Sequence, residues 1–222
     1  MSVLFIAGAG TDIGKTYVTA ALARRIRCGG GSVRVLKPIA SGVVTLDNPA
    51  FATGDTAVLL RAAGLPVDAA HVDACSPWRF VAPLAPDRAA AAEGRCVQLS
   101  EIVNWCRARI AEAASGETVL IEGAGGLMSP VTHDATVLDW LLALGCPILL
   151  VTGSYLGAIS HALTAIEVIK TRGVPLHGVV VSESAESAGL VETVDALRRF
   201  APGAAITALA RGGTALAGVT VP

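Results

Sequence analysis

Short apolar runs recur along the chain, each bounded by glycine, proline or polar residues. Five of them are continuous rather than alternating, which is typical of strands covered on both faces. These predicted strands are residues 3–7, 33–36, 119–121, 148–151 and 179–181. Helical periodicity lies between and after them, at 15–27, 56–63, 100–114, 137–144, 158–172 and 190–200. This alternation predicts an α/β fold, a mostly parallel sheet with helices on both faces.

Two regions depart from that alternation. Residues 66–98 contain four prolines and no clear strand, so we expect a loop-rich segment with one short helix near residues 89–93. After Phe200 the pattern predicts a last strand at 204–207, followed by an end rich in Gly and Ala. Neither a linker nor an internal repeat divides the chain, so we expect a single domain over residues 1–222.

The composition suits one domain with an aliphatic core. Of the 222 residues, 53% are hydrophobic and only 4% aromatic. The 17 Lys and Arg are balanced by 18 Asp and Glu, so we expect no nucleic-acid partner. No charged residue falls between Asp139 and Glu167, but Gly145-Cys146-Pro147 and Thr152-Gly153-Ser154 divide that run. We therefore expect helix, strand, turn and helix there, and no membrane span.

Cysteine usage and the N-terminus indicate a cytoplasmic protein. The five cysteines show neither Cys-x-x-Cys spacing nor the density of a disulfide framework. The first residues, Met-Ser-Val-Leu-Phe, lack the basic region that begins a signal peptide. We expect reduced thiols in the cytoplasm.

The strongest motif is a phosphate-binding loop. Strand 3–7 is followed by Gly8-Ala9-Gly10-Thr11-Asp12-Ile13-Gly14-Lys15-Thr16 and then by a helix. This is the order of a Walker A loop, although five residues rather than four separate Gly8 from Gly14. Backbone N–H groups and the helix N-terminus suit phosphate oxygens, with Lys15 on the β- and γ-phosphates and the Thr16 hydroxyl on Mg²⁺. We predict a fold of the P-loop NTPase type; the alternative is a Gly-rich turn that merely opens a helix.

Two more candidates, Glu122 and Lys37, lie at the carboxyl edge of the sheet, where open α/β sheets bind ligands, and Asp55 precedes a predicted helix. Glu122 follows strand 119–121 and opens a glycine turn, Gly123-Ala124-Gly125-Gly126, so we predict a Mg²⁺ ligand; the alternative is a solvated acid. Lys37 ends the second strand, where a lysine is commonly just a solvated strand end. Asp55 is equally consistent with the N-cap of the helix that follows it.

Together these segments resemble the dethiobiotin synthetase family. The resemblance spans residues 1 to about 182 and rests on the loop, Lys37-Pro38-Ile39-Ala40-Ser41-Gly42, Asp55, Glu122-Gly123-Ala124-Gly125-Gly126 and Leu156-Gly157-Ala158-Ile159-Ser160-His161. It implies an ATP- and Mg²⁺-dependent ligase that joins CO₂ to the adjacent amines of 7,8-diaminopelargonic acid. A carbamate forms on one amine, ATP phosphorylates it to a carbamic-phosphoric anhydride, and the second amine displaces phosphate to close the ureido ring.

The resemblance also implies a role for each site residue. The implied catalytic residues are Lys37, Lys15 and Thr11, and the implied metal ligands are Thr16, Asp55 and Glu122. The implied nucleotide-binding residues are Asp12, Ile13, Gly14, Lys15, Thr16, Tyr17, Asp55, Glu122, Gly123, Ala124, Gly125 and Ser182. The implied substrate-binding residues are Thr11, Lys37, Ser41, Gly157 and Ser160. The family is a homodimer with the diamino acid across its interface, so the helix start that contains Gly157 would serve the partner's site.

The sequence departs from the family pattern in its C-terminal part. Ser160 and Ser182 stand where the family often has asparagine, and serine lacks the paired donor and acceptor of an amide. The segment 205–210 has no clear equivalent of the Ile-Pro segment that helps the family enclose the base. Selectivity for ATP over CTP or GTP therefore stays open.

Two other classes of protein share this type of nucleotide-binding core. Dimeric switch ATPases of the partition and cell-division kind have an extra lysine near the start of the loop, where this chain has Ala9 and Gly10. Amidating ligases of the cobyrinic acid type usually add a glutamine-hydrolysing domain, for which we expect no room before Pro222. Both remain alternatives, ranked below the synthetase.

Overall fold

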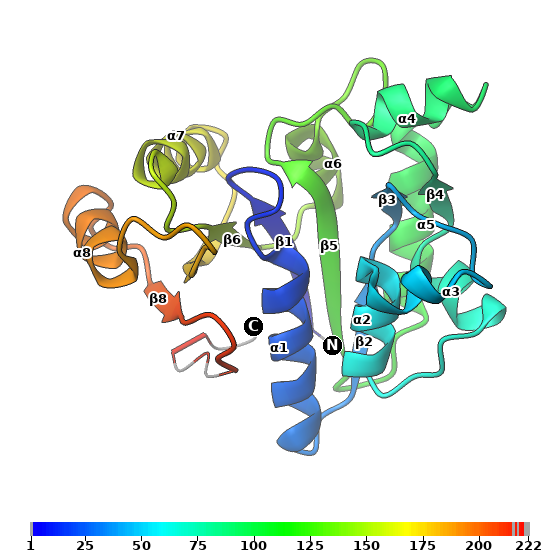
Figure 1. Ribbon diagram of the computed structural model, residues 1–222, viewed down its shortest axis with the longest axis horizontal. Coiled ribbons are helices and arrows are strands. Elements are labelled where there is room, and N and C mark those ends of the chain that lie inside the picture. The colour runs from blue at the N-terminus through cyan, green and yellow to red at the C-terminus, as the bar shows by residue number, and fades with distance from the viewer. Residues whose placement is uncertain (1, 215, 217, 220–222) are drawn as a thin grey trace.

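The main sheet holds six parallel strands in the part of the chain that the structure describes, in the order β2-β5-β1-β6-β7-β8 (Figure 1). The computed structural model describes residues 2–214, 216, 218 and 219, so both ends of the expected 1–222 domain lie outside the described residues. The strands are β1 (Ser2–Gly8), β2 (Val33–Leu36), β5 (Thr118–Gly126), β6 (Ile148–Thr152), β7 (Leu176–Ser182) and β8 (Ile206–Leu209). The predicted α/β class is confirmed.

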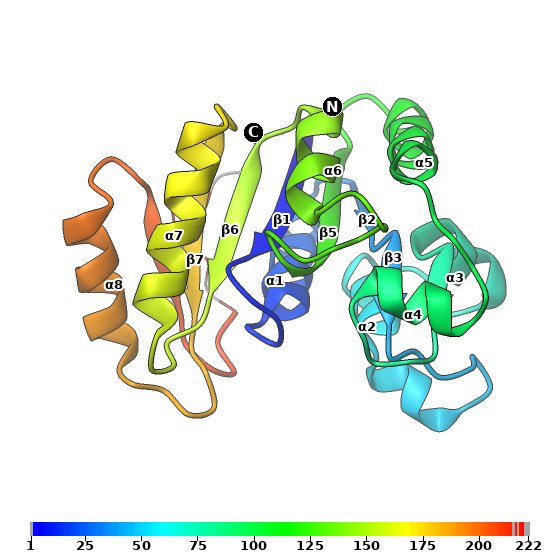
Figure 2. The same cartoon turned by 90° about the horizontal axis from the view of Figure 1, so that it is seen from above.

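Helices cover both faces of this sheet (Figure 2). One face packs against α1 (Lys15–Cys28), α2 (Asp55–Ala62) and α3 (Ala69–Cys75). The other packs against α5 (Leu99–Ala111), α6 (Val137–Leu144), α7 (Ala158–Thr171) and α8 (Leu190–Phe200). In β1, Leu4 and Ile6 point to the first layer whereas Phe5 points to the second, where its ring meets Trp140 edge to face at 5.0 Å. Burial on both faces explains why the strands are apolar without alternation.

The uncharged run between Asp139 and Glu167 has the predicted arrangement of α6, β6, a turn and α7. No helix in the described part of the chain is both long and apolar enough to span a bilayer. The last strand, predicted at 204–207, is found at Ile206–Leu209. The difference arises because Ala204 still belongs to the turn after α8, where its N–H donates to the Ala201 carbonyl at 3.2 Å.

The expectation of no strand in residues 66–98 was wrong. This segment contains α3, β4 (Trp78–Phe80) and α4 (Pro86–Ala92), the last longer than the helix predicted near 89–93. Pro86 occupies the first turn of α4, where a missing N–H is harmless. Strand β4 pairs in parallel with β3 (Ile39–Ser41), which was also not predicted. Each strand has three residues, too few to show a hydrophobic period, and η1 (Pro49–Thr53) completes this part of the chain.

Candidate active site

The phosphate loop is fixed between the two strands that flank β1. The N–H of Ala9 donates to the Val151 carbonyl of β6 at 2.8 Å, and the N–H of Leu127 donates to the Gly8 carbonyl at 2.7 Å. Gly14 is the N-cap of α1 with φ 92°, a left-handed conformation that glycine adopts at little cost. The first turn of α1 has no acidic residue and no side-chain cap, so its N–H groups are free to face an anion.

Lys37 and Glu122 meet beside this loop. The Lys37 ammonium donates to Glu122 Oε1 at 2.5 Å and lies 3.0 Å from Asp55 Oδ2. The Thr16 hydroxyl donates to the same Glu122 oxygen at 2.7 Å. The side chains of Glu122 and Lys37 are 0% and 6% exposed, whereas that of Asp55 is 49% exposed. The structure therefore brings together the four residues predicted at the carboxyl ends of β1, β2 and β5 and at the start of α2.

These contacts decide three alternatives left open by the sequence. Glu122 is not a solvated acid in a turn, because it lies within β5, which continues through the glycines to Gly126, and its side chain is fully buried. Lys37 is not a solvated strand end. Asp55 does not cap α2, because Gly54 is the N-cap and makes no side-chain bond; Asp55 is the first residue of the helix and faces Lys37.

The residues Thr16, Asp55 and Glu122 form a donor set of one hydroxyl and two carboxylates. Glu122 Oε2 is buried and has no hydrogen-bond partner among the described residues. No cluster of three or more His, Cys, Asp or Glu side chains suited to a metal occurs in the described part of the chain. A site with few protein oxygen donors suits Mg²⁺, because this ion takes its other ligands from phosphates and water.

Electrostatics separates the two lysines of the site. Burial alone would lower the pKa of Lys37, but the carboxylates of Glu122 and Asp55 outweigh burial and raise the pKa above its ordinary value. Partial burial would raise the pKa of Asp55, but the Lys37 charge and hydrogen bonds from Lys37 and Thr16 bring it below its usual range. Burial, reinforced by the charge of Lys37, lowers the pKa of Lys15 to about 8.

These groups line a cavity of about 760 Å³. Of the predicted site residues, it collects Thr11, Asp12, Ile13, Gly14, Lys15, Thr16, Lys37, Ser41, Asp55, Glu122, Ala124 and Gly125. Ser41 Oγ is buried and has no partner among the described residues. Sequence reasoning missed Ile39, Ala40, the segment 83–86 and Ser129, which also line the cavity. The only signal for 83–86 was its prolines, and Ser129 had none, although its hydroxyl accepts from the Gly126 N–H at 2.8 Å.

Five predicted residues lie outside this cavity. Gly123 is packed against the Phe5 ring, where a Cβ would come within 3.0 Å. Ser182 lies against Gly14 of the loop, since a Cβ on Gly14 would come within 2.5 Å of its hydroxyl. The Tyr17 hydroxyl donates to the Gly213 carbonyl, toward the C-terminal segment. Gly157 and Ser160 lie at the start of α7 and are exposed.

The fold and this site define a nucleotide-binding α/β protein of the P-loop class. A family model described as an AAA domain matches residues 2–211. The chain is 58% identical to the ATP-dependent dethiobiotin synthetase BioD of Methylobacterium nodulans, over 96% of this chain and 95% of the relative. It is 47% identical to the protein of the same name from Caulobacter vibrioides, over 100% and 98%. This chain belongs to the ATP-dependent dethiobiotin synthetase family.

Two solved structures with the same fold are much more distant in sequence. A MinC:MinD cell division protein complex of Aquifex aeolicus matches with a TM-score of 0.54 and 13% identity, over 95% of this chain and 81% of that chain. A ParA family ATPase of Chlorobium tepidum matches with a TM-score of 0.52 and 14% identity, over 98% and 90%. These likenesses show the P-loop fold alone.

Proposed function

We propose that this chain is an ATP-dependent dethiobiotin synthetase, a ligase that makes dethiobiotin from 7,8-diaminopelargonic acid, CO₂ and ATP. The observation that carries this proposal is the second buried lysine. Lys15 belongs to the phosphate loop, but Lys37 comes from another strand and is held charged between Glu122 and Asp55. A second fixed cation suits an anionic co-substrate, and the carbamate of the diamino acid is such an anion.

The chain's residues contribute charge and position. A carbamate oxygen attacks the γ-phosphorus of ATP and ADP leaves; the free amine then attacks the carbamate carbon, loses a proton and expels phosphate. The first step brings anions together, so catalysis must be mainly electrostatic and positional. Lys15 and Lys37 supply the positive charge. Thr11 and Ser41 hold the carbamate oxygens, and the unpartnered, buried Ser41 hydroxyl supports that role.

Magnesium and nucleotide would bind on the loop side of the cavity. Thr16, Asp55 and Glu122 would hold Mg²⁺, a role supported by the free Oε2 of Glu122. When bound, Mg²⁺ would neutralise charge on the phosphates. Residues 12–14 present backbone N–H groups to the phosphates, together with the glycine turn 123–125. Ser182 and Tyr17 contact the nucleoside, which we propose is adenosine, and comparison with CTP and GTP tests this choice.

We further propose a cytoplasmic homodimer in which the partner's α7 start receives the substrate carboxylate. Gly157 caps α7 with φ 100° and no side-chain bond, which leaves N–H groups for an anion. Nearby Leu156 is 91% exposed, and Met128 at the loop side is 56% exposed, as apolar contact residues would be. Light scattering tests the assembly, and a monomer at working concentration would contradict it. The described cysteines are all free thiols, which supports the compartment.

The first experiment measures phosphate release from Mg-ATP and bicarbonate, with and without diaminopelargonic acid, with mass spectrometry for the product. We expect release that depends on the diamine, and the mass of the ring-closed product. Lys37→Ala should lose at least about a hundredfold in rate, since one preorganised donor supplies that much in other sites. Lys170→Ala, an exposed lysine at the end of α7, is the matched control. Turnover that is equal without the diamine, with no product, would favour a nucleotide switch instead.

A further inference from the structure

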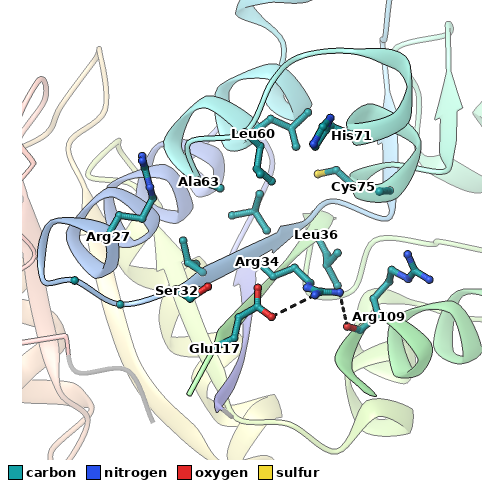
Figure 3. Close-up of a pocket in the computed structure, with 16 residues that line it drawn as sticks. Arg27, Ser32, Arg34, Leu36, Leu60, Ala63, His71, Cys75, Arg109 and Glu117 are labelled. Carbon is teal, nitrogen blue, oxygen red and sulfur yellow. Dashed lines mark hydrogen bonds and ion pairs between the residues drawn. The ribbon is translucent and has the colours of Figure 1, made fainter. Parts of the chain in front are cut away.

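A second cavity, of about 500 Å³, lies along β2 and away from the phosphate loop (Figure 3). Strand β2 is at the edge of the main sheet. One wall is formed by residues 30–36, and α2, α3 and α5 supply the others. We call this cavity the edge groove. Its volume lies within the range of small-molecule sites, roughly 300–1,000 Å³.

The outer edge of β2 presents unpaired backbone groups to the edge groove. In a parallel pair, alternate residues turn their N–H and C=O groups toward and away from the partner. The Thr118 N–H donates to the Ser32 carbonyl at 3.0 Å, so Ser32 faces β5, whereas Lys37 faces outward and donates to the Cys75 carbonyl at 2.9 Å. By this alternation Val33 and Val35 also face outward, and no hydrogen bond among the described residues reaches them. They offer a donor and an acceptor side by side.

The groove has an apolar floor between its polar ends. Leu36 of β2 lines it from the core layer of α5 and Leu60 of α2 from the core layer of α1, each 1% exposed, and Ala63 and Cys75 close it on the helix side (Figure 3). His71 of α3 also lines the groove (Figure 3). Its Nδ1 lies 2.7 Å from Asp68 Oδ1, so Nε2 is the ring nitrogen that remains for a ligand. A hydrocarbon chain of a few carbons would be covered by this floor.

Charge in the groove is unbalanced at one end. The Arg34 guanidinium lies 3.2 Å from Glu117 and 3.5 Å from Glu112, and it also donates to the Arg109 carbonyl, so its charge is compensated. Arg27 makes one weak hydrogen bond, to the Ala62 carbonyl at 3.4 Å, and no ion pair with a described residue. Its guanidinium is therefore available to an anion, at the end of the groove where β2 begins.

We propose that the edge groove binds a small organic acid with an amide or urea group at its far end. The carboxylate pairs with Arg27, the chain covers the apolar floor, and the planar amide or urea pairs with the outward groups of Val35. The rise from Ser32, just before β2, to Val35 is about 10 Å, which matches a carboxylate joined to a urea by a chain of several carbons. Dethiobiotin belongs to this class, so on the proposed function the enzyme's own product is a suitable probe.

The test is equilibrium dialysis of radiolabelled dethiobiotin against the full chain. Saturating diaminopelargonic acid and the Mg²⁺ complex of a non-hydrolysable ATP analogue fill the active site. We expect one further molecule bound per chain. Arg27→Ala should weaken this binding at least tenfold, whereas Arg24→Ala, an exposed arginine in the same helix that does not line the groove, should leave it unchanged.

A steric variant and two analogues complete the design. Ala74 is exposed and lines the groove, so Ala74→Tyr should block binding without disturbing the core, whereas Ala70→Tyr one turn earlier should not. Dethiobiotin methyl ester lacks the charge and octanoate lacks the urea, so each should bind at least tenfold more weakly. Absence of the extra molecule, or equal effects of each variant and its control, would overturn the proposal. The readout is binding, so failure of turnover would contradict the proposed function and leave this result intact.

Discussion

The pKa values of the two lysines in the candidate active site are shifted in opposite directions. Lys37 has two carboxylates within 3.0 Å, and they keep its ammonium charged in spite of full burial. Among the described residues, Lys15 has only the Gly10 carbonyl, at 3.1 Å, as its hydrogen-bond acceptor, and it lies close to the charge of Lys37. An empty phosphate loop is therefore electrostatically costly for Lys15, and the negative charge of a nucleotide relieves that cost.

At the residue scale, ATP affinity should depend on the protonation of Lys15. With its pKa lowered to about 8, Lys15 is charged below pH 8 and neutral above it in the free protein, whereas bound phosphates favour the charged form. Affinity should be flat below pH 8 and fall above it, by up to about tenfold per pH unit. Titration calorimetry between pH 7 and 9.5 measures this. Lys15→Arg, which stays charged, should bind more weakly but without this slope; the same slope in both proteins would contradict the assignment.

At the element scale, helix α6 begins with a reciprocal cap that follows the glycine turn of β5. Asp139 Oδ2 accepts from the Thr136 N–H at 2.8 Å and from its hydroxyl at 2.7 Å. The Thr136 hydroxyl in turn accepts from the Asp139 N–H at 3.4 Å. The N–H and hydroxyl of Thr136 lower the pKa of Asp139 below its ordinary value. This cap fixes where the loop after Gly126 ends and α6 begins.

Thr136→Ala should lower the free energy of unfolding by about 1 kcal/mol at pH 7, as caps of this type usually do. Asp139 has a lower pKa in the folded state, so its stabilising contribution is present above its unfolded pKa, near 3.8, and is lost as pH falls through the folded pKa. The difference between variant and native protein should therefore shrink in acid. Urea unfolding of the two proteins at pH 7 and in acid measures this difference in the free energy of unfolding. Thr171→Ala, an exposed threonine at the end of α7, is the control, and an equal loss there would refute the cap's contribution.

At the scale of the whole molecule, the two core layers separate the cysteines into reactive and protected thiols. Cys28 and Cys96 are exposed, whereas Cys75 is buried in the layer of α1 and Cys106 and Cys146 in the layer of α5–α8. Burial raises the pKa of the three buried thiols to about 11, 12 and 11 respectively. The thiolate is the reactive species. These three thiols are therefore protected both by burial, which excludes reagents, and by their raised pKa values, which keep them protonated.

A disulfide reagent such as dithionitrobenzoate at pH 8 should therefore titrate two thiols quickly in the native protein and all five after unfolding in guanidinium. The remaining three should react at the rate of global opening, because they lie within the core. Absorbance of the released thiolate follows the reaction. Rapid reaction of a third thiol in native protein would show that one of the layers is open in solution.

Most of the fold and the centre of the candidate active site could be predicted from residues that lie close together in the sequence. Continuous apolar runs such as 148–151 identified five strands of the main sheet, because a strand buried on both faces needs no partner to show its pattern. The phosphate loop was recognisable because its glycines, Lys15 and Thr16 are adjacent in sequence. Glu122 and Lys37 were identified from the strands that they follow, because parallel strands end at one edge.

Tertiary structure decided whatever depends on residues far apart in the chain. It turned Asp55 from a possible cap into the partner of Lys37, because the direction of α2 is set by packing against α1 and not by local sequence. It paired β3 with β4 and brought the segment 83–86 to the cavity, because three-residue strands are too short to form without a partner strand and packing around them. It also placed Ser182 against Gly14 and outside the cavity, and it made β2 an edge strand, since strand order is a property of the sheet and no short segment encodes it.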